Sequence, residues 1–288
     1  MNFREAILHG ERMGAGYSLV APRALVSNSG GGRVSRRAGG SLEFRDHREY
    51  HPGDDLRHVD WNVVARSDRL IVKQFHEEVS PVVDLIVDGS RSMQLADTRK
   101  AEATLATASF LATAARNAGF PYTLSMARAK PEVVARGAMR PIEWPELAFD
   151  FAGSPAATLL GSATILRPLG IRILISDLLW EGEPRAVLSS LAQNAAALIV
   201  VQLLAESEEA PDVRGGWRVV DVETGQWREV VFDAAAAARY HDALLRHRAL
   251  WDDAARHVKA IVVRGVAERV IERLLFDELA AAEILRAS

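Results

Sequence analysis

Short apolar runs recur along the middle of the chain, separated by stretches with helical spacing. The clearest runs are rich in Val, Ile and Leu, which is typical of strands buried on both faces of a parallel sheet; they are residues 82–87, 171–176 and 197–204. A further strand pair is predicted at 122–127 and 132–136. Amphipathic helices are predicted at 100–118, 156–169 and 185–195. This alternation predicts an α/β fold with a mostly parallel sheet and helices on both faces.

The two ends of the chain follow other patterns. Residues 28–40 are rich in Gly, Ser and Arg and predict a loop or arm, and residues 41–80 are polar and aromatic without a helical period. Within residues 217–232, two runs of alternating apolar and polar residues flank a turn sequence, and this pattern predicts a hairpin. Beyond it we expect a strand at 260–263 and helices at 234–257, 266–279 and 280–287. We therefore divide the chain into an N-terminal arm with a small polar/β segment (1–80), a core (81–210) and a hairpin, strand and helices packed on the core (211–288).

Composition narrows the class of protein. The chain has 288 residues, of which 49% are hydrophobic, and its net charge is −3, so charge gives no argument for nucleic-acid binding. There is no cysteine, which excludes thiolate metal sites and cysteine nucleophiles. We also find no secretory signal and no apolar run of about 18 residues, so we expect a cytoplasmic protein with no membrane span.

The chemistry is concentrated where two of the predicted strands end. Asp88, Ser90 and Ser92 directly follow the first buried strand, and Asp177 follows the strand at 171–176. Because ligands of open α/β sheets bind outside the carboxyl ends of the strands, we expect these side chains at one edge. Such an all-oxygen set favours a hard cation, Mg²⁺ first and Mn²⁺ or Ca²⁺ as alternatives. A plainer interpretation is a cluster of helix N-caps.

This pattern resembles a known metal site. Asp88-Gly89-Ser90-Arg91-Ser92 matches the D-x-S-x-S element of the metal-ion-dependent adhesion site of von Willebrand factor A-type domains, and Asp177 matches its later aspartate. The site's middle threonine is replaced by Ser154, with Thr158 as the alternative ligand. The resemblance implies a von Willebrand factor A-like (Rossmann-like) fold. It also implies a cation bound weakly until an Asp or Glu of a protein partner completes its shell.

A second resemblance lies upstream of the sheet. The chain is similar, over roughly residues 30–232, to the bacterial family catalogued as domain of unknown function 58. The matching positions are Glu43, Arg48, Tyr50, Asp54, Asp55, Arg57, Asp60, Trp61 and Arg66, with a later Asp221-Val222-Glu223-Thr224-Gly225. Members of this family are often encoded beside a MoxR-type AAA+ ATPase, which the resemblance implies as a partner.

The upstream segment itself allows three interpretations. The favoured interpretation is a purely structural role, in which Arg48 and Arg57 pair with carboxylates and Trp61 lies in the core. The others are a second metal or acid–base site that uses its histidines, and an interaction surface. Trp217 and Trp227 flank the hairpin turn and are expected as a packed cross-strand pair, with an interface anchor as the alternative.

The leading functional hypothesis is a protein-interaction module, not an enzyme, that acts with the AAA+ ATPase in chaperone-like assembly or maturation. The first alternative is a metal-dependent hydrolase or phosphotransferase that uses Asp88. It is disfavoured because Ser90 stands where an aspartyl-phosphate loop carries its second carboxylate. The second alternative is a structural protein whose cation site is vestigial.

Overall fold

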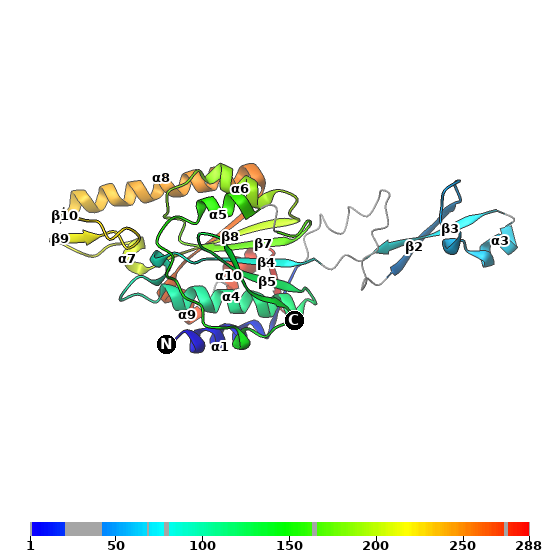
Figure 1. Ribbon diagram of the computed structural model, residues 1–288, viewed down its shortest axis with the longest axis horizontal. Helices are drawn as coiled ribbons and strands as arrows, with labels where there is room; N and C mark the ends of the chain where they lie inside the picture. Colours follow the sequence, from blue (N-terminus) through cyan, green and yellow to red (C-terminus); the bar gives the residue numbers. More distant parts are fainter. Residues whose placement is uncertain are drawn as a thin grey trace. The chain divides into compact units, whose positions relative to one another are not determined.

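In the computed structural model, a mostly parallel β-sheet lies at the centre of the unit formed by residues 1–22 and 81–288 (Figure 1). The model describes residues 2–20, 42–67, 69–77, 81–162, 166–273 and 276–287, and within them six strands form this sheet. They are β4 (Val83–Asp88), β5 (Tyr122–Ala127), β6 (Pro131–Gly137), β7 (Ile171–Ser176), β8 (Ala197–Leu204) and β11 (Ile261–Val266). Their order is β11-β8-β7-β4-β5-β6, and only the β5–β6 pair is antiparallel. The predicted α/β fold with a mostly parallel sheet is confirmed.

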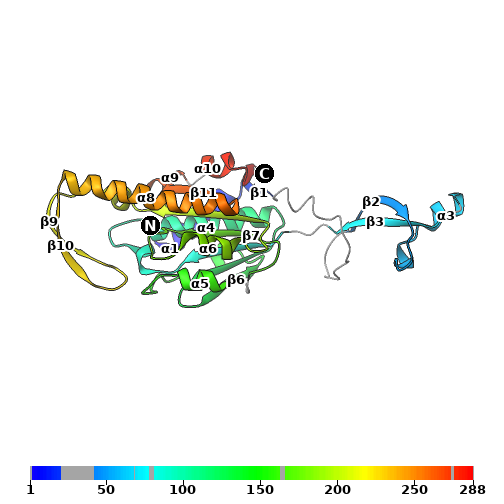
Figure 2. The ribbon, with the colours of Figure 1, turned by 90° about the horizontal axis from the view of Figure 1, so that it is seen from above.

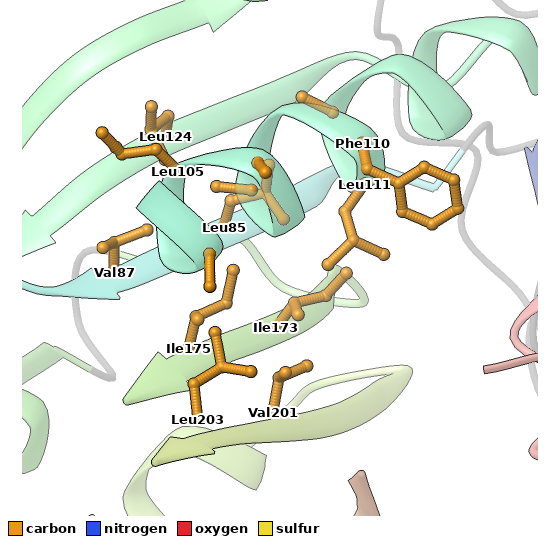
Figure 3. Close-up of a cluster of buried hydrophobic side chains, with 14 of the residues drawn as sticks. Leu85, Val87, Leu105, Phe110, Leu111, Leu124, Ile173, Ile175, Val201 and Leu203 are labelled. Atoms are coloured by element: carbon orange, nitrogen blue, oxygen red, sulfur yellow. The ribbon is translucent and has the colours of Figure 1, made fainter. Parts of the chain in front are cut away.

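Helices cover both faces of the sheet. On one face lie α4 (Lys100–Asn117), α1 (Phe3–Gly14) and α9 (Ala267–Arg273); on the other lie α5 (Ala156–Gly161), α6 (Pro184–Ala192) and α8 (Ala234–Val258) (Figures 1 and 2). Because strand side chains alternate, Leu85 and Val87 of β4 face α4 whereas Ile86 joins the opposite core. The residues that fill the α4 side are drawn in Figure 3. Burial on both faces explains why β4, β7 and β8 are nearly continuous apolar runs.

Helix α1 was not predicted, and it packs on α4 through small residues. A Cβ atom added at Gly10 would lie 2.1 Å from the carbonyl oxygen of Ala106, so only glycine allows this approach. The Ser109 hydroxyl of α4 donates a hydrogen bond to the Ile7 carbonyl at 2.6 Å. These contacts place residues 1–22 in one unit with residues 81–288, whereas residues 23–80 form the other unit.

The C-terminal part departs from the expected helices. Helix α9 is followed by α10 (Phe276–Ala281) and then by β12 (Leu285–Ala287), which pairs antiparallel with β1 (Tyr17–Leu19). The helix predicted at 280–287 is therefore wrong over its last residues, because Leu285 pairs with Leu19 and both side chains are buried. Helix α5 ends at Gly161, so the helix predicted at 156–169 is too long. Residues 163–165 of that range lie outside the described residues.

The predicted hairpin is confirmed as β9 (Gly215–Val220) paired with β10 (Trp227–Phe232), between the short helix α7 (Glu206–Glu209) and α8. Trp217 lies opposite Val230 and Trp227 lies opposite Val220, so the two tryptophans do not face each other. Their side chains are 49% and 59% exposed. The prediction that the two tryptophans pack against each other is therefore wrong, because each lies opposite a valine of the other strand.

The unit of residues 23–80 contains an antiparallel pair of its own, β2 (Leu42–Glu49) and β3 (Ile71–Glu77). The 3-10 helix η1 (Leu56–His58) and helix α3 (Trp61–Ser67) connect the two strands. Val59 and Val72 are buried, whereas Trp61 is 63% exposed, so the prediction that Trp61 lies in the core is wrong. The predicted loop at residues 28–40 lies outside the described residues.

No helix within the described residues is both long enough and apolar enough to cross a membrane.

Candidate cation site at the carboxyl edge of the sheet

The sheet has a topological switch point between β4 and β7. The chain passes from β4 to β5 on one side and from β7 to β8 and β11 on the other. Asp88 ends β4, and Ser176 ends the neighbouring β7, so both lie at the carboxyl edge where ligands of open α/β sheets bind.

Asp88, Ser90 and Ser92 converge as the sequence predicted. The Asp88 side chain is fully buried, and its Oδ1 accepts hydrogen bonds from the Ser90 backbone N–H at 2.9 Å and the Ser90 hydroxyl at 2.6 Å. The Ser90 and Ser92 Oγ atoms lie 3.0 Å apart. The other Asp88 oxygen accepts from the Ser176 hydroxyl at 2.6 Å, a partner that sequence analysis missed. Hydroxyls from two strand ends therefore surround one buried carboxylate.

The plainer N-cap interpretation does not describe this loop. Ser90 precedes the 3-10 helix η2 (Arg91–Gln94) without a capping hydrogen bond from its side chain, and α4 begins only at Lys100. The backbone N–H that Asp88 Oδ1 accepts therefore belongs to Ser90 in the loop and not to the first turn of α4.

Asp177 lies at the same edge but already has a cationic partner. Its Oδ2 accepts a hydrogen bond from Lys100 Nζ at 2.7 Å, and its Oδ1 accepts from the Leu179 N–H at 2.9 Å. Lys100 Nζ also donates to Glu208 Oε1 at 2.8 Å, and the Lys100 side chain is fully buried. Sequence analysis missed both Lys100 and Glu208, since neither belongs to a recognisable motif.

The buried charges do not balance. Asp88, Asp177 and Glu208 contribute three carboxyl groups, and Lys100 contributes one ammonium. Burial, and then the charge of Asp177, raise the pKa of Asp88 to about 6. Burial also raises the pKa of Glu208, although Lys100 opposes that shift. Burial alone would lower the pKa of Lys100, but the two carboxylates outweigh it and raise that pKa. The cluster therefore has room, electrostatically, for additional positive charge.

Hydroxyl oxygens are essential to any cation site at this edge. Within the described part of the chain, no group of three or more His, Cys, Asp and Glu side chains is placed to hold a metal ion. The chemistry of the donor set fits a hard cation in another way, because Asp88 supplies one carboxylate and Ser90 and Ser92 supply neutral oxygens.

The two candidates for the middle ligand are hydrogen-bonded elsewhere. The Ser154 hydroxyl donates to the Glu181 carbonyl at 2.8 Å and accepts from the Ala156 N–H. The Thr158 hydroxyl donates to the Arg128 carbonyl. The structure does not bring either hydroxyl to Asp88, so the role of Ser154 or Thr158 as a ligand stays a prediction.

A carboxylate from the hairpin reaches the same loops. Glu223 Oε1 accepts a hydrogen bond from the Ser92 N–H at 2.9 Å, and its Oε2 accepts from the Gly153 N–H at 3.1 Å. Asp221 positions the turn, because its Oδ1 accepts from the Glu223 and Thr224 N–H groups. Sequence analysis interpreted this segment as a hairpin turn and as part of the family resemblance, and it assigned no role to Glu223. The signal that could have identified Glu223 was the D-x-E-T-G element of the family resemblance.

The upstream polar segment consists mainly of paired charges. Arg48 binds Asp54 through two hydrogen bonds of 2.6 Å, and Arg57 binds Asp55 at 2.6 Å. The predicted arginine–carboxylate pairs are confirmed. The hydrogen bond from Arg48 lowers the pKa of Asp54 to about 2, and the hydrogen bond from Arg57 lowers that of Asp55 further.

The remaining signature positions have varied surroundings. Asp60 is buried, lies 2.9 Å from His47 Nε2 and 3.3 Å from Lys73 Nζ, and the His47 hydrogen bond lowers its pKa to about 2. Tyr50 donates its N–H to the Leu70 carbonyl, and Arg66 is exposed near the end of α3. The side chain of Glu43 lies outside the described residues.

Part of this chain is similar to a family of known proteins. Residues 46–137 match the model of the family described as "Protein of unknown function DUF58", which confirms the resemblance over that segment. The uncharacterized proteins Rv1480 of Mycobacterium tuberculosis and Mb1516 of Mycobacterium bovis are each 27% identical over 233 residues, which is 77% of this chain and 72% of each relative.

Two solved structures share a looser likeness. One is the conserved hypothetical protein BatB from Bacteroides thetaiotaomicron, 11% identical with a TM-score of 0.37, which covers 70% of this chain and 99% of its own. The other is an aerotolerance-related membrane protein from Bacteroides fragilis with multiple mutations to serines, 13% identical with a TM-score of 0.36 over 68% of this chain and 99% of its own.

Proposed function

We propose that this chain is a protein-binding module with a von Willebrand factor A-like fold, in which Asp88, Ser90 and Ser92 hold a divalent cation. The observation that carries the proposal is their convergence in a buried cluster that has three carboxyl groups and one ammonium. An ion with two positive charges would balance that excess. We propose binding and not catalysis, because Ser90 stands where an aspartyl-phosphate loop carries its second carboxylate, whereas Asp88 Oδ2 accepts only the Ser176 hydroxyl and keeps a lone pair for a cation.

Magnesium is the cation that the donors favour, with manganese or calcium as alternatives. Mg²⁺ prefers six oxygens and retains several waters, so one carboxylate and two hydroxyls would leave positions open. A carboxylate from a protein partner is suited to one of these positions. With few charged ligands of its own, the site is expected to bind the ion weakly until the partner arrives.

The nature of the partner rests on the family resemblance alone. That resemblance favours a MoxR-type AAA+ ATPase, or a client of it, and a cytoplasmic role in assembling or maturing a protein complex. Gel filtration of this chain with a MoxR-type ATPase from the same organism, with and without Mg²⁺, tests the pairing. We expect comigration that depends on the cation, and separate elution under every nucleotide condition would contradict the pairing.

Thermal unfolding with Mg²⁺ or Mn²⁺ tests the cation site itself. An ion that binds only the folded state stabilises it by about 2.7 kcal/mol at a hundredfold excess over its Kd. We expect a higher Tm for the wild type and no change for Asp88→Asn, which keeps the size of the side chain. Thr113→Ala is the control, because its hydroxyl donates to the Ser109 carbonyl within α4 and belongs to no candidate ligand set; it should respond as the wild type does. Wild-type protein that binds no Mn²⁺ by electron paramagnetic resonance would refute the site.

A structural role is the second candidate, and Lys100 is the observation that favours it. Its ammonium already pairs with Asp177, the position at which the family of adhesion sites has a metal-associated aspartate. In this case Lys100 would be the resident cation of the cluster. Asp88→Asn would then change neither ion binding nor partner binding.

A further inference from the structure

The carboxylate of Glu223 is held by two loops that are remote from it in sequence. One hydrogen bond comes from the N–H of Ser92, in the loop that carries the cation ligands, and the other comes from the N–H of Gly153, just before α5. Each oxygen accepts one bond, so both loops together form a cradle for a single carboxylate. Charged hydrogen bonds of this kind are among the stronger ones in proteins.

The hairpin that carries Glu223 has little else to anchor it by packing. All six residues of β9 are exposed, and the exposed side chains of β10 include Trp227 and Val231. Glu223 itself is partly buried, whereas its neighbours in the turn are exposed. The contact between the hairpin tip and the cation loop therefore depends mainly on this one side chain.

We propose that Glu223 occupies the place that a partner's carboxylate takes at the cation site, and that the β9–β10 hairpin is a latch which the partner must displace. The competition rests on the proposed function, because it requires a cation at Asp88, Ser90 and Ser92. The latch contacts themselves are made to backbone N–H groups and do not require the ion.

The chemistry defines what displaces the latch. An Asp or Glu side chain on an acidic segment of the partner accepts the same two N–H groups and lies next to the Ser92 hydroxyl. A neutral segment can accept these bonds only through uncharged amide or carbonyl oxygens, which form weaker bonds, and a Lys or Arg side chain cannot accept them. An occupant that is tethered to the site lowers the apparent affinity of a competitor by the fraction of time for which the site is open. The latch thus keeps the site closed to weak acidic ligands.

Hydrogen exchange of the hairpin amides tests the latch. Glu223→Gln keeps the size of the side chain but removes its charge and places an amide against one N–H donor. We expect exchange at residues 215–232 and at the Ser92 and Gly153 amides to rise by about tenfold, which corresponds to about 1.4 kcal/mol. Glu229→Gln is the matched control, because Glu229 lies on the same hairpin with only a 3.8 Å ion pair to Arg218. Equal exchange in the two variants would overturn the latch.

Acetate is the probe for the competition. Mn²⁺ bound to the protein relaxes the methyl protons of acetate that approaches it, and we expect about tenfold stronger relaxation in Glu223→Gln than in the wild type or Glu229→Gln. Equal relaxation in all three Mn²⁺-loaded proteins would overturn the competition. Wild-type protein that binds no Mn²⁺, combined with faster hairpin exchange in Glu223→Gln, would refute the cation site and leave the latch supported.

Discussion

The sheet edge and the upstream segment are both rich in aspartate, yet their charges are arranged in opposite ways. At the edge, Lys100 is the one ammonium beside the carboxyl groups of Asp88, Asp177 and Glu208 in the described cluster. In the upstream segment Asp54 and Asp55 each have an arginine of their own. The pKa of Asp88 is raised to about 6, and that of Asp54 is lowered to about 2.

This difference in charge balance indicates which of the two regions is the better candidate for a cation site. A carboxylate with its own cation at the surface has nothing further to gain from a metal ion. Buried carboxylates that outnumber the cations beside them destabilise the folded state, and binding of a further cation relieves that destabilisation. The density of Asp and His along the sequence is therefore a poorer guide to a cation site than the balance of the buried charges.

Replacement of Lys100 should cause the largest loss of folding stability among the changes that distinguish the two regions. Lys100→Met leaves Asp177 and Glu208 buried without their ammonium, and breaking such a buried pair costs about 3–5 kcal/mol. We expect the free energy of unfolding in urea to fall by that order and Mg²⁺ to restore more stability than it gives the wild type. Arg57→Met in the upstream segment is the control and should cause no measurable loss, because that pair is exposed. A Lys100→Met protein as stable as the wild type would show that the buried charges do not limit stability.

The pH dependence of stability should have opposite signs in the two regions. The folded-state pKa of Asp88 lies near 6, above its ordinary value of 3.8, so the folded state holds the proton more tightly. Without metal, the contribution of Asp88 to stability therefore falls as pH rises from about 4 to about 6, by an amount on the order of 1–3 kcal/mol.

Urea unfolding in the presence of a chelator measures this slope. We expect it to be smaller in Asp88→Asn than in the wild type, and saturating Mg²⁺ should remove the difference. Identical slopes for the two proteins in chelator would contradict the raised pKa of Asp88.

Much of the sheet edge could be predicted because its determinants are local. The apolar runs of β4 and β7 predict two strands of a parallel sheet. Parallel strands end at the same edge of the sheet, so the residues that follow them lie close together. The convergence of Asp88 with Ser90 and Ser92 follows directly from that geometry. The arginine pairs of the upstream segment are also local, since Arg48 and Asp54 are six residues apart.

The rest could not be predicted because its determinants are distant in the sequence. Lys100 reaches Asp177 only because α4 begins twelve residues after Asp88, and no pattern at the start of that helix indicates a buried ammonium. Glu223 is separated from Ser92 by 131 positions, and its local pattern describes only a turn. The packing of α1 against α4 depends on the close contact of Gly10 with Ala106. That contact could be predicted only by knowing beforehand that the two helices touch.

The smallest effect is expected in the upstream segment, where a titration of Asp54 measures how strongly Arg48 lowers the pKa of that carboxyl group. Arg48→Met removes the two hydrogen bonds that hold the pKa of Asp54 at about 2, so that pKa should rise toward the ordinary 3.8. In the wild type the pair stabilises the segment above the ordinary pKa and is lost as pH falls from about 4 to about 2; the variant should lose this dependence. Carboxyl-carbon chemical shifts report the titration, and Arg69→Met, whose ion pair is with Glu49, should leave it unchanged. An Asp54 that still titrates near pH 2 without Arg48 would mean that the backbone N–H of His51, and not the arginine, sets its charge state.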